Sequence, residues 1–254
     1  MGLSCIKLTI LGSLRTPKSL GELSKIVGKS KQTVVFHLKP LLESGLVGKI
    51  LVDKRVCYQT SELGSLVLEA NTRLKMLENV VRTAGKFFCE HDVSAIPQNV
   101  FEDLHLLDGC RVVARSNPYE FYELERVLMG SGWIKGPSSV YHDRFPEMFV
   151  SLAAMKSVEL VITEDVFKMV VEKAAAKLEE YLKHGRMYVC DNIRLAFVVA
   201  EKGLVMVLYR LNGVYDVQNI LVCETKDAVR WGLRLFEYYK LKSSRIACFT
   251  GSDH

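Results

Sequence analysis

A stripe of apolar residues with the spacing of one long helix occupies the segment from 61 to about 91. Its members recur at alternating intervals of four and three: Leu63, Val67, Ala70, Leu74, Leu77, Val81, Ala84 and Phe88. An apolar repeat sustained for more than three heptads is typical of a coiled coil. We therefore expect a long connecting helix over residues 61–92, with a dimer contact through Leu63, Val67, Ala70, Leu74, Leu77, Val81 and Phe88. The alternative is that the stripe packs against its own chain.

The first sixty residues show three short helical patterns followed by a hairpin pattern. The apolar faces are Ile6, Ile10 and Leu14, then Leu20, Leu23 and Val27, then Val34, Leu38 and Leu41. Ser30 is a good N-cap for the third helix and Gly45 ends it, whereas Pro40 should kink or loosen it. Strand-like residues 49–52 and 56–58 flank a turn at 53–55. Three helices and a basic hairpin predict a winged helix over residues 1–60, whose third helix normally enters the major groove of DNA.

The positive charge of the chain is concentrated in this segment. Residues 1–60 carry ten Lys or Arg against three acidic residues, a net charge of +7, while the remaining residues carry a net charge of −2. Local basicity of this kind indicates a nucleic-acid partner, although a charged face is more often merely solvated.

Three short motifs carry a family resemblance. The segments SKQTVVFHLK (30–39), LLESGLV (41–47) and YQTSELG (58–64) resemble the recognition helix, its ending and the post-wing segment of ArsR- and MarR-like winged-helix repressors. The resemblance implies double-stranded operator DNA as the partner. On the outward face of the third helix, Gln32, Thr33 and Phe36 are placed to contact base edges, and His37 to meet a base edge or a phosphate. The full set of expected DNA contacts is Lys29, Ser30, Lys31, Gln32, Thr33, Phe36, His37, Lys39, Lys54 and Arg55. Of these, Lys29, Lys39, Lys54 and Arg55 are placed for phosphates, which position a protein without specifying sequence.

Residues 93–254 alternate between strand and helix patterns, with a boundary at 92–97. Strands are expected at 110–115, 133–141 and 158–163, with two or three more up to 211. A first helix is expected to start at Asn117-Pro118 and to bury Leu124 and Leu128, and a second is expected at 146–155. A third helix has the inward face Val166, Val170, Ala174, Leu178 and Tyr181. A last helix is expected at 224–242, where Ala228, Trp231, Leu235 and Tyr238 share one face. This order predicts an α/β domain with a mixed, partly parallel sheet. The fold class is therefore multi-domain α/β.

This half of the chain also resembles a known domain. The segments AIP (95–97), LVIT (160–163), NGVYD (212–216) and AVRWGLRLFEYY (228–239) resemble the effector domain joined to winged helices in regulators of methanogenic archaea. A looser similarity connects it with archaeal sugar-responsive regulators, whose sheet is phospholipase-D-like. The catalytic motif of phospholipase D is missing, because the H-x-K at His37-Leu38-Lys39 lies in the DNA-binding helix and lacks the following Asp.

We expect no enzymatic activity, no cofactor and no metal. No phosphate-binding glycine loop, nucleophile elbow or H-E-x-x-H motif occurs, and the six histidines lack metal-ligand spacing. The seven cysteines are odd in number and contain no C-x-x-C pair, so a disulfide framework is not expected. A redox-sensing thiol, for example Cys57 or Cys89, stays open.

A small-molecule effector is expected at the carboxyl ends of the parallel strands, where open α/β sheets leave a crevice. The candidate residues are Arg115, Ser116, Asn117, Thr163, Glu164, Arg210, Asn212, Tyr215 and Asp216, each of which also has a plain structural interpretation as a cap, a turn residue or a core aromatic. Taken together, the patterns predict a cytoplasmic, homodimeric, DNA-binding transcriptional regulator. The alternatives are a thiol-based redox regulator and a winged-helix factor that docks on a protein.

Overall fold

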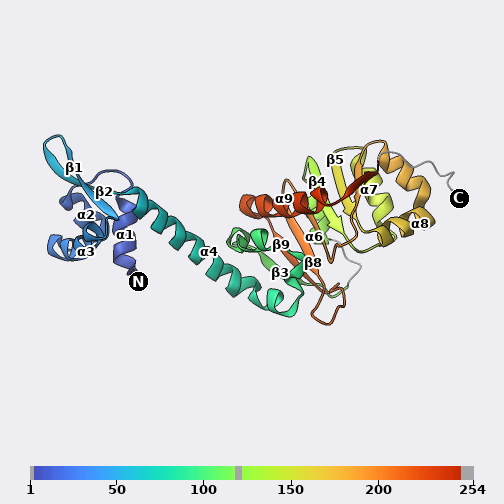
Figure 1. The fold of residues 1–254 in the computed structure, drawn as a ribbon, viewed down its shortest axis with the longest axis horizontal. Coiled ribbons are helices and arrows are strands. Elements are labelled where there is room, and N and C mark those ends of the chain that lie inside the picture. Colours follow the sequence, from blue (N-terminus) through green and yellow to red (C-terminus); the bar gives the residue numbers. More distant parts are fainter. Residues whose placement is uncertain (1–2, 118–121, 247–254) are drawn as a thin grey trace. The chain divides into compact units, whose positions relative to one another are not determined.

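The computed structural model describes residues 3–117 and 122–246, which form two compact units (Figure 1). The units comprise Met1–Lys75 and Met76–His254, and each is described by itself. Among the helices of the described residues, none has the length and apolarity needed to span a bilayer.

The N-terminal unit is a winged helix. Helices α1 (Cys5–Ser13), α2 (Leu20–Val27) and α3 (Lys31–Glu43) precede the antiparallel strands β1 (Val47–Val52) and β2 (Arg55–Thr60). Their apolar faces bury Ile10, Leu14, Leu23, Val34, Leu38 and Leu41 in one core, as the periodicity predicts. Helix α2 starts in a capping box in which Ser19 and Glu22 exchange hydrogen bonds. Helix α3 continues through Pro40 to Glu43, and Gly45 follows its end with a φ of 71°, as a helix-terminating glycine should.

The turn of the wing is one residue shorter than expected. Asp53 and Lys54 alone form it, both with positive φ (50° and 63°), and Arg55 already pairs with Val52 in the hairpin. Positive φ at both central residues is typical of the two-residue turn that matches the twist of an antiparallel hairpin. Arg55 is therefore the first residue of β2.

The long helix α4 (Glu62–Glu90) follows the wing directly. At its start, Gly64 lies so close to β1 that an added Cβ would be 2.2 Å from the carbonyl oxygen of Leu46. No larger residue fits there without moving the backbone. The glycine thus fixes how α4 leaves the winged helix.

The C-terminal unit contains an eight-stranded mixed sheet in the order β10-β6-β5-β4-β7-β8-β9-β3. The strands are β3 (Arg111–Ala114), β4 (Trp133–Ser138), β5 (Ser157–Ile162), β6 (Arg186–Val189), β7 (Leu195–Ala200), β8 (Gly203–Leu208), β9 (Asn219–Cys223) and β10 (Ser244–Ile246). Strands β4, β5 and β6 are parallel to one another, whereas the remaining neighbours pair antiparallel. The predicted mixed, partly parallel α/β sheet is confirmed.

Helices cover both faces of this sheet (Figure 1). One face packs against α6 (Tyr122–Met129), α7 (Phe145–Ala153) and α8 (Glu164–Leu182), and its core includes Leu128, Val150, Val166 and Leu178. The other face packs against α9 (Lys226–Leu241), the end of α4, the short helix α5 (Gln98–Phe101) and the 3₁₀ turns η1 (Val93–Ala95) and η2 (Leu104–Leu107), around the fully buried Trp231. Two separate hydrophobic cores therefore flank the sheet, one on each face.

Several elements differ from the sequence expectation. Strands β9 and β10 and the short turns between residues 93 and 107 were not expected. The expected start of α6 at Asn117-Pro118 falls partly outside the described residues. Helix α8 is kinked at Ala174, where φ is −148° and ψ is 35°.

A disulfide joins Cys110, just before β3, to Cys223 at the end of β9. The two Cα atoms are 4.3 Å apart, and both residues are buried. The expectation that the cysteines stay unpaired is wrong for this pair. The spacing of the cysteines in the sequence does not predict this disulfide, because its two cysteines are 113 residues apart and meet only when β3 and β9 pair.

Candidate nucleic-acid interface and effector pocket

Helix α3 presents one polar face around a single large aromatic side chain. Its N-cap, Ser30, accepts a hydrogen bond from the Thr33 backbone N–H at 3.2 Å, so the helix starts at Lys31. With Val34 and Leu38 buried, Lys31 and Gln32 are exposed and Phe36 is 74% exposed. These side chains occupy the helix face that enters the major groove in winged helices.

His37 lies differently from its neighbours. Its ring meets that of Phe36 edge to face, with centroids 5.2 Å apart. The Nδ1 atom is buried and has no hydrogen-bond partner among the described residues, so this nitrogen is turned away from solvent. In this orientation, the atoms of the His37 ring other than Nδ1 are the ones placed to contact a base or a phosphate.

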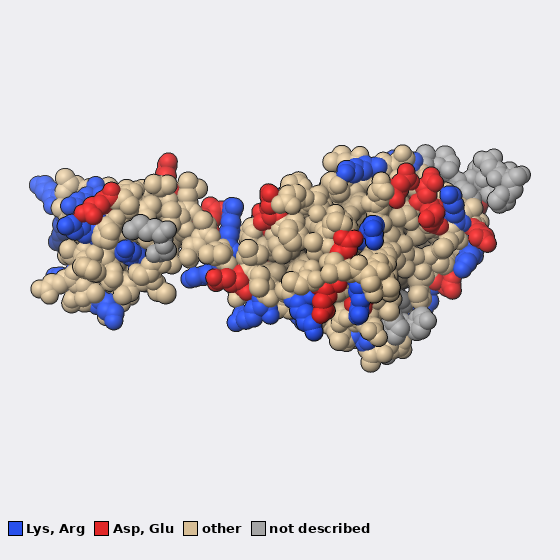
Figure 2. Space-filling model, turned by 60° about the horizontal axis from the view of Figure 1, so that its bottom comes forward, with Lys and Arg blue, Asp and Glu red and all other residues tan. Residues whose placement is uncertain are grey.

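The basic side chains of this unit are largely unneutralised. Lys39 lies 3.9 Å from Glu43 along α3, with both side chains exposed, a geometry that contributes little. Over residues 3–117 and 122–246, no carboxylate lies within ion-pair distance of Lys29, Lys31, Lys54 or Arg55. Figure 2 shows Lys and Arg gathered over this unit, while both signs mix over the C-terminal unit. Together with the net charge of +7 over residues 1–60, this surface favours an anionic partner.

The stripe on α4 is exposed over most of its length. Leu63, Leu74 and Val81 are 52%, 54% and 62% exposed, and Ala70 and Leu77 are exposed as well. Val67 packs partly on the winged-helix core, and Phe88 partly on the sheet core. The residues of α4 that are buried by their own unit lie mostly off the stripe, at Leu68, Val80 and Phe87. Apart from Val67, the single chain therefore leaves the expected dimer residues from 63 to 81 exposed.

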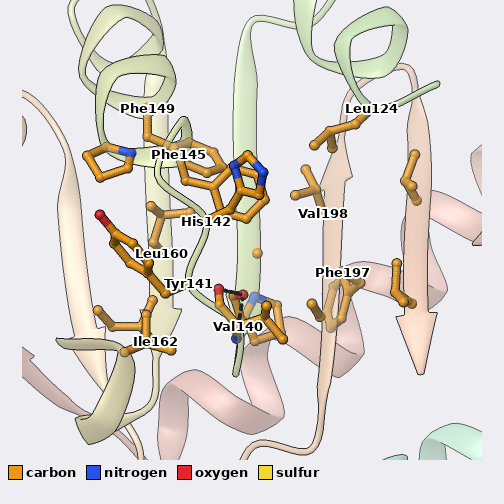
Figure 3. A pocket seen from close by; sticks show the side chains of 18 of the residues that line it. Leu124, Val140, Tyr141, His142, Phe145, Phe149, Leu160, Ile162, Phe197 and Val198 are labelled. Atoms are coloured by element: carbon orange, nitrogen blue, oxygen red, sulfur yellow. Dashed lines mark hydrogen bonds between the residues drawn. The ribbon is translucent and has the colours of Figure 1, made fainter. Parts of the chain in front are cut away.

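An apolar cavity of about 190 Å³ lies in the C-terminal unit, between the sheet and helices α6, α7 and α8. Strands β4, β5, β7 and β8 supply its floor, which includes Leu160, Ile162 and Val198. Aromatic rings crowd its helical side (Figure 3): the rings of His142 and Phe145 have centroids 5.3 Å apart, and Phe149 lies beside them.

Two of the expected effector residues line this cavity, namely Arg115 and Tyr215. The others lie elsewhere. Thr163 caps α8 by accepting a hydrogen bond from the Val166 backbone N–H, and Asn212 accepts one from the Val214 N–H in a turn. Glu164 starts α8 at the surface, and Ser116 and Asn117 are exposed at the end of β3. The cavity itself is built from aliphatic and aromatic residues that look like ordinary core, so no sequence signal marks it.

The exposed Arg210 and the buried Asp216 belong to a polar network that sequence reasoning missed. The Asp216 carboxylate accepts hydrogen bonds from Arg210 Nε (3.1 Å), Asn219 Nδ2 (2.9 Å) and the backbone N–H groups of Gln218 and Asn219. Burial opposes its ionisation, yet these bonds, led by that of Asn219, hold the pKa of Asp216 far below its usual value.

His91 completes this network from the end of α4. Its Nε2 lies 3.0 Å from Asp216 Oδ2 and its Nδ1 lies 2.6 Å from the carbonyl oxygen of Phe87. Both ring nitrogens face oxygen acceptors, so each hydrogen bond needs a ring N–H. Two backbone bonds, from Asp92 N to Tyr209 O and from Leu211 N to Glu90 O, join the same segments. The C-terminal end of α4 is thus tied to the segment whose residues Tyr215 and Val217 line the cavity.

Comparisons with known proteins match both halves of the chain. The family described as bacterial regulatory protein, arsR family, matches residues 7–49, and the family described as the middle domain of methanogenesis regulatory protein FilR1 matches residues 118–242. The methanogenesis regulatory protein FilR1 of Methanothrix harundinacea is 27% identical over 256 residues, covering 95% of this chain and 56% of the relative. The chain thus spans just over half the length of this curated relative.

The solved structures to which the chain is similar include TrmBL2, described as an archaeal chromatin protein. It has a TM-score of 0.45 and 13% identity, and the match covers 96% of this chain and 94% of that one. The phospholipase D family member Nuc of Salmonella typhimurium has a TM-score of 0.42 and 8% identity over 54% of this chain and 97% of its own. The two family matches confirm the resemblances that the sequence motifs indicate. Residues 7–49 thus match an ArsR-family helix-turn-helix domain, and residues 118–242 match a FilR1-type middle domain.

Proposed function

We propose that this protein regulates transcription by binding operator DNA with α3 and the wing. The observation that carries the proposal is the outward face of α3, where exposed polar and basic residues surround Phe36 in an ArsR-family domain of strongly positive charge. Gln32, Thr33, Phe36 and His37 face base edges, while Lys29, Ser30, Lys31, Lys39, Lys54 and Arg55 face the backbone.

We propose further that the protein binds DNA as a homodimer through α4. The exposed leucines and valines of the stripe keep heptad spacing from Leu63 to Val81, and a second copy of the same helix is the partner that such a stripe fits. A two-fold symmetric operator also requires two readers about one helical turn apart.

The C-terminal unit is proposed to sense a small molecule and to act on DNA binding through α4. This role is supported by the bonds between His91, Asp216 and the cavity-lining segment around Tyr215. A ligand changes DNA binding only if it prefers one arrangement of the protein to the other. Equal effector affinity for free and DNA-bound protein would therefore contradict this role. We propose no catalytic activity and no cofactor, and a place in the cytoplasm beside the DNA.

A second candidate function is docking on a protein. Leu51 is 76% exposed and Val56 53% exposed on the wing, and exposed apolar residues gathered in one place are typical of protein contacts. This observation keeps the protein-docking alternative testable beside the DNA proposal.

Titration of fluorescent DNA from the gene's own upstream region, against a scrambled duplex and at several salt concentrations, tests the proposal. We expect tight binding that survives scrambled competitor, and a loss of roughly a thousandfold in affinity between about 50 and 200 mM salt. In Lys54→Ala the slope of log affinity against log salt should fall by about one for both duplexes. Lys168→Ala, an exposed lysine of the C-terminal unit, is the matched control. Weak binding that is equal for both duplexes would contradict the proposal and favour docking on a protein.

A further inference from the structure

We infer that the cavity between the sheet and helices α6, α7 and α8 binds an uncharged, mostly hydrocarbon ligand with about six to ten carbon atoms. The inference rests on the proposed effector role of this unit and names the chemistry of the effector. Apolar cavities of about 150 Å³ in other proteins stay dry and bind benzene. The present cavity, with its volume of about 190 Å³, is slightly larger.

The walls offer apolar surface from every side. The strands contribute Leu160, Ile162, Val198, Val205 and Val207, and the helices contribute Leu124, Phe145, Phe149, Val166 and Val170. In Figure 3 the rings of Phe145 and Phe149 lie on one side of β4, with Val198 and Leu124 across it. Burial of a hydrocarbon against such walls is favourable in proportion to the apolar area removed from water.

Four of the polar side chains at the walls already have partners within the chain. Ser138 Oγ donates to the Val140 carbonyl at 2.9 Å, and the Tyr181 hydroxyl lies 3.2 and 3.0 Å from the carbonyl oxygens of Val158 and Arg186. Glu123 pairs with Arg111 at 3.0 Å, and Lys177 with Glu147 at 2.9 Å. A charged ligand would have to break these bonds or enter without compensation, and either course is costly.

Arg115 does not turn the site into an anion site. Burial lowers the pKa of Arg115 from its ordinary value, while the neighbouring Tyr215 and Asp216 oppose this shift. Its positive charge therefore lies in the field of the Asp216 carboxylate. An anionic ligand would compete with a carboxylate that is itself fixed by four hydrogen bonds from Arg210, Asn219 and Gln218.

A path to solvent lies between α7 and α8. A surface hollow beside the cavity shares Tyr141, Pro146 and Lys177 with it and extends along residues 172–177. The kink of α8 at Ala174 lies in this hollow. Small outward displacements of the kinked helix segment would widen this path without disturbing the sheet.

The test is a comparison of toluene, benzoate and benzylamine, which share one ring and differ in charge. Thermal unfolding of the 254-residue chain, without DNA, is followed by intrinsic tryptophan fluorescence. At about ten times its dissociation constant, toluene should raise the melting midpoint by about 3–5 °C. Benzoate and benzylamine should leave it unchanged. Because DNA is absent, a negative result here leaves the proposed DNA binding untouched, and the DNA titration in turn says nothing of the cavity.

Substitutions that fill the cavity test whether toluene binds there. Val198→Phe fills the space from β7 and should abolish the toluene shift, while Val214→Phe, the same change at an exposed site outside the cavity, should keep it. If Val198→Phe does not fold, Ala196→Leu fills less of the same space from the same strand. The inference is overturned if benzoate or benzylamine stabilises as much as toluene, if toluene gives no shift, or if a filled variant responds like the wild type.

Discussion

At the scale of single residues, Phe36 is the side chain whose position most needs an explanation. Isolated exposed apolar residues are common, but Phe36 projects from the middle of the polar face of α3, beside Gln32 and Thr33. An apolar side chain at this place is suited to contact the methyl group of thymine in the major groove. The residue therefore has a role in the DNA proposal and none in the core.

Replacement of Phe36 by Ala should lower affinity for the specific duplex by about tenfold, or ~1.4 kcal/mol, because one base contact is lost. The melting midpoint should stay unchanged, since the side chain is exposed. Fluorescence anisotropy with specific and scrambled duplexes measures the first effect, and thermal unfolding the second. Ile26→Ala, at an exposed apolar residue of α2, is the control. An equal loss on both duplexes would mean that Phe36 reads no base.

Asp216 is a buried carboxylate that accepts hydrogen bonds from several groups of the C-terminal unit. Asp216→Asn should destabilise the protein by about 3 kcal/mol, because His91 and Arg210 lose a buried carboxylate that accepts from both. Asp227→Asn, which removes an exposed partner of Arg230, should change stability by less than about 1 kcal/mol. Urea unfolding of the two variants beside the wild type measures both effects.

The pH dependence of this effect has a definite sign. Because the folded-state pKa of Asp216 is depressed, its stabilisation is complete above the unfolded-state pKa of about 4 and is lost as pH falls toward the folded-state pKa. The stability difference between wild type and Asp216→Asn should therefore be constant at neutral pH and shrink below about pH 4. A difference that grows on acidification would contradict the assignment.

At the scale of elements, α4 carries most of the argument about assembly. Leu74→Lys combined with Leu77→Lys should shift the protein from dimer to monomer, since two like charges then face their copies across the proposed contact. Sedimentation at several protein concentrations measures the change. Thr72→Lys, on the same helix but off the stripe, should leave the dimer intact. A wild type that sediments as a monomer at all concentrations would remove the dimer proposal.

Elements with a clear period were predictable, and elements that depend on distant pairing were not. The faces of α1, α2 and α3 follow from local apolar spacing and from caps such as Ser30 and Gly45. Strand β9 escaped prediction because its neighbours in the sheet are β8 and β3, and the latter lies more than 100 residues earlier. Register and partner choice are not local properties of a short apolar run.

The same contrast applies to the candidate site. The exposed face of α3 follows directly from knowing which helix positions are buried. The cavity does not, because Leu160, Val198 and Phe149 would look identical in sequence if they packed without a void. Arg115 and Tyr215 were found because charged and polar residues at strand ends attract attention, whereas His91 had no pattern to reveal its bond to Asp216.

At the scale of the whole molecule, the bond between Cys110 and Cys223 spans most of the C-terminal unit in sequence. Closing a loop of this length removes conformational freedom from the unfolded chain, by about 4–5 kcal/mol in the chain-entropy model. Regulation by a thiol switch and regulation by a ligand therefore predict different behaviour of this disulfide. A purely structural disulfide stabilises the unit without altering DNA affinity. A regulatory disulfide must alter both the stability of the unit and its affinity for DNA.

Double replacement of Cys110 and Cys223 by Ala should lower the melting midpoint by roughly 10 °C, as expected from the loss of a cross-link of this length. A reducing agent that reaches the bond should have the same effect on the wild type. Cys89→Ala, at an exposed and unpaired cysteine, should change neither the midpoint nor its response to reductant. DNA affinity at 25 °C should be equal for the oxidised protein, the reduced protein and the double variant, because the bond joins β3 to β9 within the sheet and touches no residue of the proposed DNA contact. A change of tenfold or more in DNA affinity on reduction would contradict this and assign regulation to the cysteines.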